Sequence, residues 1–107
     1  MHICTYATAI SMQPKRYIVG LFKGSLTLEY VSKEKEMVLQ ILAEHQFRLV
    51  NLLGKQSGRR VDKLARLQKR QLLAGWQGFP VLKDCVAVMH LIVRDQWDAG
   101  DHVAFLC

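Results

Sequence analysis

Two apolar runs separated by a turn open the chain. Residues 3–11 are mainly small, hydroxylated and apolar, the pattern breaks at Pro14, and a β-branched and aromatic run follows from Tyr17 to Phe22. β-branched and aromatic side chains favour extended backbone, whereas proline interrupts the hydrogen-bonding ladder of a strand. The pattern therefore predicts two strands joined by a turn.

The second run ends in a short segment that combines one cation, one glycine and two hydroxyls. These residues are Lys23, Gly24, Ser25 and Thr27, and a helical pattern over residues 28–35 follows them, with Thr27 as its cap. Exposed backbone N–H groups and the positive end of a helix dipole favour a phosphate at such a junction. We therefore expect an anion cradle here, although an ordinary polar turn would have the same composition.

The middle of the chain predicts one strand and two helices. Residues 37–43 form a continuous apolar run of strand length, which indicates a buried strand. Apolar positions recur at helical spacing over residues 44–53, and Gly54 is a natural helix end. We expect this helix to pack one face on the sheet. A polar loop over residues 55–60 leads to a second helical pattern over residues 61–73.

The last third predicts a loop and two further strands. Two glycines and a proline place the aromatic residues of 75–80 in a loop. The almost wholly apolar residues 85–94 predict a long strand, residues 98–101 a turn, and residues 102–107 a last strand with an uncovered edge. At least five strands interspersed with helices favour a single α+β domain with a barrel-like sheet over a doubly wound sheet.

The positive charge of the chain is concentrated in one stretch. The formal net charge is +6, and the excess falls on residues 55–70. Such a patch can serve nucleic acid, a phosphate-bearing cofactor or only a solvated face. No interleaved aromatic residues or nucleic-acid recognition motif accompanies the run, so a nucleic-acid-binding module is the weaker hypothesis.

The sequence has no pattern typical of a disulfide framework, a metal site or a membrane span. The three cysteines have no short spacing, which argues against a disulfide framework or a zinc site, and no histidine pair has metal-ligand spacing, so we assign no metal. No apolar run is long enough to span a membrane. We therefore expect a soluble, cytoplasmic protein in a reducing compartment.

Five segments of the chain stand out as motifs. They are residues 3–27, Ser57-Gly58, Asp62-Lys63-Leu64, residues 78–82 and Gly100-Asp101-His102. In this order and spacing the sequence resembles the flavin reductase-like family of FMN-binding split barrels over nearly its whole length. The resemblance implies a split β-barrel of Greek-key-like topology with short flanking helices and a bound FMN.

The resemblance also implies which residues hold the flavin. The family's phosphate site matches the segment that the residue pattern singles out, at Lys23, Ser25 and Thr27. The family's opening strand, which runs along the isoalloxazine edge, matches Cys4, Thr5, Tyr6 and Ser11. Ile3 stands where the family has threonine, so backbone groups would replace any hydrogen bond from that side chain.

Four further candidates come from the later motifs. Ser57, Asp62 and Lys63 match the loop and helix start that approach the flavin, and Asp62 can cap that helix at the same time. His102 matches the flavin or nicotinamide side of the pocket and is the candidate catalytic residue, whereas an isolated turn histidine would be structural. His90 lies in an apolar run and is expected in the core.

The resemblance implies an activity and an assembly as well. The family forms homodimers with flavin at the interface, and hydride transfer from NAD(P)H to bound FMN needs few side chains because the isoalloxazine accepts the hydride. A non-catalytic FMN-binding protein or electron carrier is the alternative. Family members carry a further first strand and C-terminal part, so we expect residues 1–107 to form one shortened FMN-binding domain.

Overall fold

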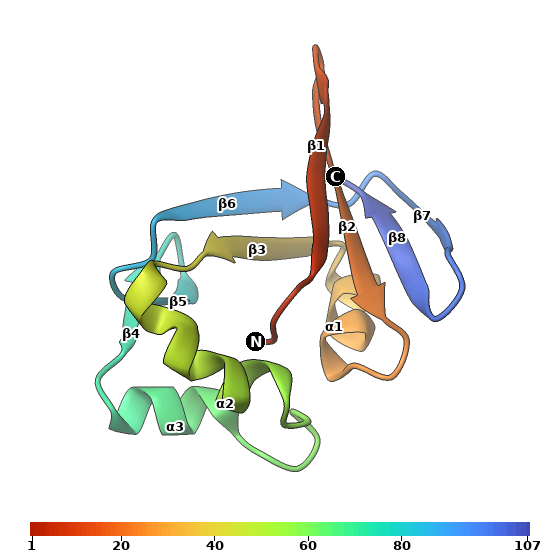
Figure 1. Cartoon of the computed structure of the whole chain (residues 1–107). Helices are drawn as coiled ribbons and strands as arrows, with labels where there is room; N and C mark the ends of the chain where they lie inside the picture. Colours follow the sequence, from red (N-terminus) through yellow and green to blue (C-terminus); the bar gives the residue numbers. More distant parts are fainter.

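The computed structural model describes residues 1–107 as a mixed α+β fold with three separate sheets (Figure 1). The strand order is β1-β2-β8-β7 in the largest sheet, and β3 pairs with β6 and β4 with β5. No helix is long and apolar enough to cross a lipid bilayer. The elements are β1 (Tyr6–Met12), β2 (Lys15–Phe22), α1 (Leu26–Glu34), β3 (Glu36–Ile41), the 3-10 helix η1 (Glu44–Leu49), α2 (Val50–Gly54), α3 (Lys63–Lys69), β4 (Leu73–Trp76), β5 (Phe79–Leu82), β6 (Ala87–Ile92), β7 (Asp95–Asp98) and β8 (His102–Leu106).

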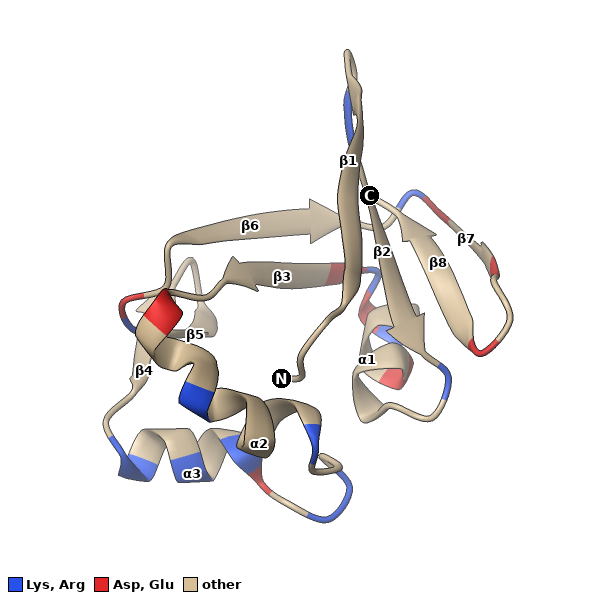
Figure 2. Ribbon diagram, viewed as in Figure 1, with Lys and Arg blue, Asp and Glu red and all other residues tan.

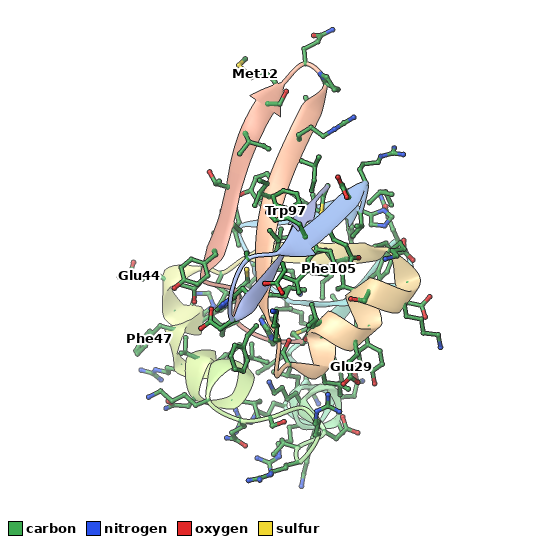
Figure 3. The ribbon with its side chains drawn as sticks, turned by 90° about the vertical axis from the view of Figure 1, so that its right-hand side faces the viewer. Met12, Glu29, Glu44, Phe47, Trp97 and Phe105 are labelled. Carbon is green, nitrogen blue, oxygen red and sulfur yellow. The ribbon has the colours of Figure 1, made fainter.

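The opening hairpin confirms the two predicted strands. β1 and β2 are antiparallel, the turn falls at Gln13-Pro14, and the register shifts at a bulge between Ala9 and Ser11. The tip of the hairpin projects beyond the rest of the molecule, with Met12 91% exposed (Figures 1 and 3). Tyr6, at the base of the hairpin, therefore lies beside the body of the fold, whereas Met12 at the tip lies away from it.

Alternation along β2 and β8 forms the first hydrophobic core. Val19 pairs with Phe105 and Leu21 with Val103, so one face of the two strands is apolar. Phe105 is completely buried there, together with Val31 of α1. β8 lies between β2 and β7, so the predicted uncovered edge of the last strand is wrong. β7 escaped prediction because its four residues are all exposed and show no apolar alternation.

The start of α1 differs from the prediction. The helix begins at Leu26, and the Ser25 Oγ accepts a hydrogen bond from the Leu28 backbone N–H at 3.2 Å, so Ser25 is the cap and Thr27 lies in the first turn. Serine and threonine can both cap a helix. The turn after β2 places Ser25, and not Thr27, at the residue before the first helical position. The Ser25 Oγ also donates to the carbonyl of Phe22 at 2.8 Å, which ties the helix start to the end of β2.

The helical middle of the chain forms a second core. The predicted helix over residues 44–53 is present as η1 followed by α2. The predicted helix over residues 61–73 is shorter and ends at Lys69, because Gln71 has a φ of 58° and Leu73 already belongs to β4. The buried members of this cluster are Leu49, Leu52, Leu53, Leu67 and Leu82. The helices therefore pack mainly on one another and on β5.

A hairpin replaces the loop predicted for residues 75–80. β4 and β5 are joined by Gln77 and Gly78, whose φ values are 49° and 84°. Two successive residues with positive φ match the type I′ turn that suits the twist of a two-residue hairpin. The loop prediction is therefore wrong, because glycine here shapes a tight turn and does not interrupt pairing. The predicted strand over residues 85–94 is confirmed as the shorter β6, paired with β3.

Candidate functional site

A cavity of about 910 Å³ lies between the amino-terminal segment, the start of α1 and the connection from α2 to α3. Its wall includes residues 1–6, residues 24–27, residues 53–64 and His102. Small-molecule sites are typically about 300–1,000 Å³, so this cavity can take a ligand of nucleotide size.

Most predicted site residues line this cavity although they come from four separate parts of the sequence. These residues are Cys4, Thr5, Tyr6, Ser25, Thr27, Ser57, Asp62, Lys63 and His102. Ser11 and Lys23 do not line it. Ser11 lies beside the bulge of β1, paired with Arg16 towards the hairpin tip.

Lys23 lies outside the cavity with a partner of its own. Its ammonium Nζ donates to Asp98 Oδ2 at 2.6 Å, and its backbone N–H donates to the carbonyl of Asp101 at 2.9 Å. The Lys23 side chain is 41% exposed. The hydrogen bond from Lys23 holds the pKa of the Asp98 carboxyl below its ordinary value. Lys23 therefore joins the end of β2 to the turn between β7 and β8.

Lys63 has the opposite surroundings. Only 6% of this residue is exposed, its Nζ donates to the carbonyl of Leu53 at 2.7 Å, and no carboxylate lies within ion-pair distance. Burial lowers the pKa of the Lys63 ammonium because removal from water disfavours the charged form. The preceding Asp62 caps α3 by accepting from the Ala65 N–H at 2.9 Å, as the sequence predicts.

The start of α1 faces the same cavity through residues 24–27. The first backbone N–H groups of an α-helix have no acceptor within the helix, and the helix dipole adds partial positive charge at that end. The Ser25 hydroxyl is already occupied by the Leu28 N–H and the Phe22 carbonyl. The main-chain amides and the dipole therefore supply more attraction for an anion here than the Ser25 side chain does.

The connection between α2 and α3 adds three cations to the wall. Lys55, Arg59 and Arg60 line the cavity, and Figure 2 shows blue segments along this connection and along α3. Arg59 forms an ion pair with Glu29 of α1, which links the connection to that helix. Part of the basic run therefore lines the cavity, and its buried member Lys63 is unavailable to a polyanion on the outer surface.

His102 closes another side of the cavity at the start of β8. Its Nδ1 lies 2.7 Å from Asp101 Oδ1, and this hydrogen bond lowers the pKa of the Asp101 carboxyl. The imidazole packs edge-on against Tyr6 and Phe22, with ring centroids 5.0 and 5.8 Å away. The carboxylate and the two rings fix the orientation of the imidazole.

Some cavity residues escaped sequence analysis. Phe22 and Tyr30 both line the wall, and Tyr30 follows Thr27 by three residues, so the two share one face of α1. That spacing is the signal that could have found Tyr30. His2 also lines the cavity, and burial, followed by the neighbouring charge of Lys63, lowers its pKa. Trp76 and Phe79 lie in the β4–β5 hairpin outside it.

Comparisons with known proteins found a matching family and similar folds. The sequence profile described as "Flavin reductase like domain" matches residues 2–107. A comparison with curated protein sequences found no match. An FMN-binding protein from Thermus thermophilus, solved with bound p-hydroxybenzaldehyde, superimposes with a TM-score of 0.80 and 27% identity over 96% of this chain and 57% of its own.

Two further solved structures are similar. The flavin reductase PheA2 in its native state has a TM-score of 0.72 and 26% identity, over 94% of this chain and 60% of its own. Flavoredoxin from Methanosarcina acetivorans has a TM-score of 0.82 and 16% identity, over 96% of this chain and 54% of its own, which supports the fold alone. The chain thus spans less than two thirds of the length of these proteins.

Proposed function

The chain belongs to the flavin reductase-like domain family, and from this premise we propose that it is a flavoprotein that binds FMN in the cavity beside α1. The observation that carries the proposal is the convergence of a buried cation, Lys63, and the start of α1 on one space of nucleotide size. A flavin mononucleotide is a planar ring system joined to a phosphate, and the cavity offers suitable partners for both parts.

Different parts of the cavity wall offer partners for the two parts of FMN. The start of α1 and the basic connection are suited to the phosphate. Cys4, Thr5 and Tyr6 form another part of the wall, where backbone groups can address the polar rim of the ring. Burial raises the pKa of the Cys4 thiol, so this wall adds no negative charge near neutral pH.

We further propose that the protein is an NAD(P)H-dependent oxidoreductase. The bound flavin would supply hydride acceptance, a chemistry that belongs to the cofactor and asks of the protein mainly binding and orientation. Asp101 holds the His102 Nδ1, which leaves the other ring nitrogen free to hydrogen-bond to a flavin or nicotinamide group. The FMN-binding protein without catalysis, or the electron carrier, is the competing proposal for the same cavity.

The proposal includes an assembly and a place of action. A homodimer with flavin at the interface would cover the apolar side chains of the opening hairpin, where Tyr6, Ile10 and Met12 are all exposed. Closure of the three sheets into a split barrel, and a cytoplasmic location, belong to the same proposal. Light scattering of wild type and of Ile10→Asp tests the dimer, because a charge on this surface should shift the protein towards monomer.

The test of the cofactor begins with the purified protein. Mass spectrometry of the released ligand should identify FMN, and a colourless protein that binds neither FMN nor riboflavin would contradict the proposal. Anaerobic addition of NADH or NADPH should then bleach the visible flavin absorbance. A flavin that stays oxidised would support the electron carrier, and salt-dependent DNA retention by a flavin-free protein would support the nucleic-acid alternative.

A further inference from the structure

The buried ammonium of Lys63 has fewer partners than its chemistry allows. An ammonium group carries three N–H donors, and one of them reaches the Leu53 carbonyl at 2.7 Å. No carboxylate neutralises its charge. A buried charge without a counter-ion is unfavourable, so its persistence at a cavity wall points to an anion that comes from the ligand.

Other side-chain charges around the cavity either have partners within the protein or are exposed to water. The carboxylate of Asp62 accepts from the Ala65 N–H as the cap of α3, and Arg59 is paired with Glu29. Lys55 and Arg60 are exposed to water, which screens their charge. Among the lysine and arginine side chains of the wall, Lys63 is therefore the one on which water acts least.

The alternative cation for a phosphate is Lys23, at the end of β2. Asp98 lies 2.6 Å from its Nζ, and the Lys23 side chain does not line the cavity. A phosphate at Lys23 would have to share the ammonium with the Asp98 carboxylate, which already neutralises its charge. A phosphate at Lys63 breaks nothing, because the two remaining N–H donors can bind it while the Leu53 carbonyl keeps the third.

We infer that Lys63, and not Lys23, is the counter-ion of the flavin phosphate, which it binds together with the first turn of α1. The inference rests on the proposed flavin binding and adds to it the cation that recognises the charged end of the cofactor. Riboflavin, which has the same ring but no phosphate, makes no use of Lys63.

The alternative role for Lys63 is purely structural. Leu53 belongs to the last turn of α2, and a lysine that donates to a carbonyl at a helix end stabilises that end. A structural role would make a Lys63 variant less stable and would weaken both flavins equally. Only a contact with the phosphate makes the variant lose affinity for FMN while it keeps its affinity for riboflavin.

The experiment compares Lys63→Met with Lys23→Met, using FMN and riboflavin as the two probes and the quenching of flavin fluorescence as the measurement. A charged hydrogen bond of about 1.5–3 kcal/mol corresponds to a loss of FMN affinity of about 10- to 150-fold in Lys63→Met. Riboflavin affinity should stay unchanged in this variant, and Lys23→Met should leave both affinities at the wild-type value.

Each contrary result has a distinct meaning. An equal loss for both flavins in Lys63→Met, or a selective loss of FMN in Lys23→Met, would overturn the assignment and leave the flavin-binding proposal in place. A wild-type protein that binds neither flavin would overturn the proposed function, and the assignment with it.

A measurement on the wild type removes the question of whether the variant folds. At alkaline pH the flavin phosphate is a dianion, and burial holds the pKa of the Lys63 ammonium below its ordinary value, as it does for the amino terminus and His2 in the same wall. FMN binding should then take up protons, seen by titration calorimetry in two buffers of different ionisation enthalpy, and riboflavin binding should take up none. Equal uptake for the two ligands would contradict the assignment.

Discussion

The end of β2 and the start of α3 each carry one lysine, and the surroundings of the two lysines are opposite. Lys23 is exposed and paired with Asp98, whereas Lys63 is buried with a single carbonyl acceptor. An exposed ion pair is strongly screened and contributes little, while a buried unpaired ammonium is unfavourable until an anion arrives. The comparison teaches that the position of the counter-ion, and not the chemistry of the side chain, decides which lysine is available to a ligand.

The largest expected effect comes from the packing that holds Lys63 in place. Leu67 lies one turn after Lys63 on α3 and is completely buried among leucines of the second core. Leu67→Ala should lower the free energy of unfolding by about 2–5 kcal/mol, because it removes apolar contacts and leaves a cavity. Urea denaturation measures this change. Leu64→Ala on the exposed side of the same helix should change the stability by less than about 1 kcal/mol, and an equal effect of both variants would contradict this account.

The pH dependence of stability sharpens the comparison next. The pKa of Lys63 is lower in the folded protein than in the unfolded chain, so the unfolded chain binds more protons at alkaline pH. The penalty for burying the ammonium is fully present below the lowered pKa, and stability is gained as pH rises from it to the ordinary lysine value of about 10.4. Urea midpoints of the ligand-free protein at several alkaline pH values should show this gain in wild type relative to Lys63→Met, which removes contributions from other groups. Parallel profiles for the two proteins would show that Lys63 titrates normally.

The cap of α1 gives a smaller effect on the side of β2. Ser25→Ala should lower the free energy of unfolding by about 1 kcal/mol, because the Leu28 N–H loses its acceptor. Thr27→Ala is the matched control, since Thr27 lies in the first turn and makes no cap hydrogen bond. Thermal unfolding of the two variants measures the difference, and a larger loss in Thr27→Ala would place the cap at the position that the sequence pattern suggested.

The smallest effect is expected at Lys23 itself. Its pair with Asp98 is exposed on both sides, and such pairs contribute about 0–1 kcal/mol. Lys23→Met should therefore change the free energy of unfolding by no more than this amount, measured by urea denaturation at low and high salt. A loss of several kcal/mol would mean that the link from β2 to the turn before β8 is essential to the fold.

Local patterns in the sequence predicted the elements that bury one face. The β-branched and aromatic run from Tyr17 to Phe22 indicates a strand directly, and Ile18 to Phe22 of β2 pair with β8. The same rule fails for β7, which is polar and exposed and exists because β8 offers a partner edge. It also fails for Gln77 and Gly78, where positive φ makes a hairpin of a segment that resembles a loop.

The candidate site was predicted unevenly for a related reason. Short motifs located Lys63, Thr27 and His102, which the fold brings to one cavity. Sequence alone could not show that Lys23 meets a carboxylate 75 residues away. It also gave no measure of burial, which distinguishes the two lysines. Interactions between distant segments therefore limit what a local pattern can reveal about a binding site.

The central position of β8 has a consequence for motion at the site. Its backbone is hydrogen-bonded to β2 on one edge and to β7 on the other, and it carries His102 at its first residue and the fully buried Phe105 further along. Amide protons of β8 should therefore exchange with deuterium slowly, in contrast to those on the free edge of β1. The imidazole is therefore carried by a strand that is hydrogen-bonded on both edges, and we expect it to keep its position when a ligand binds.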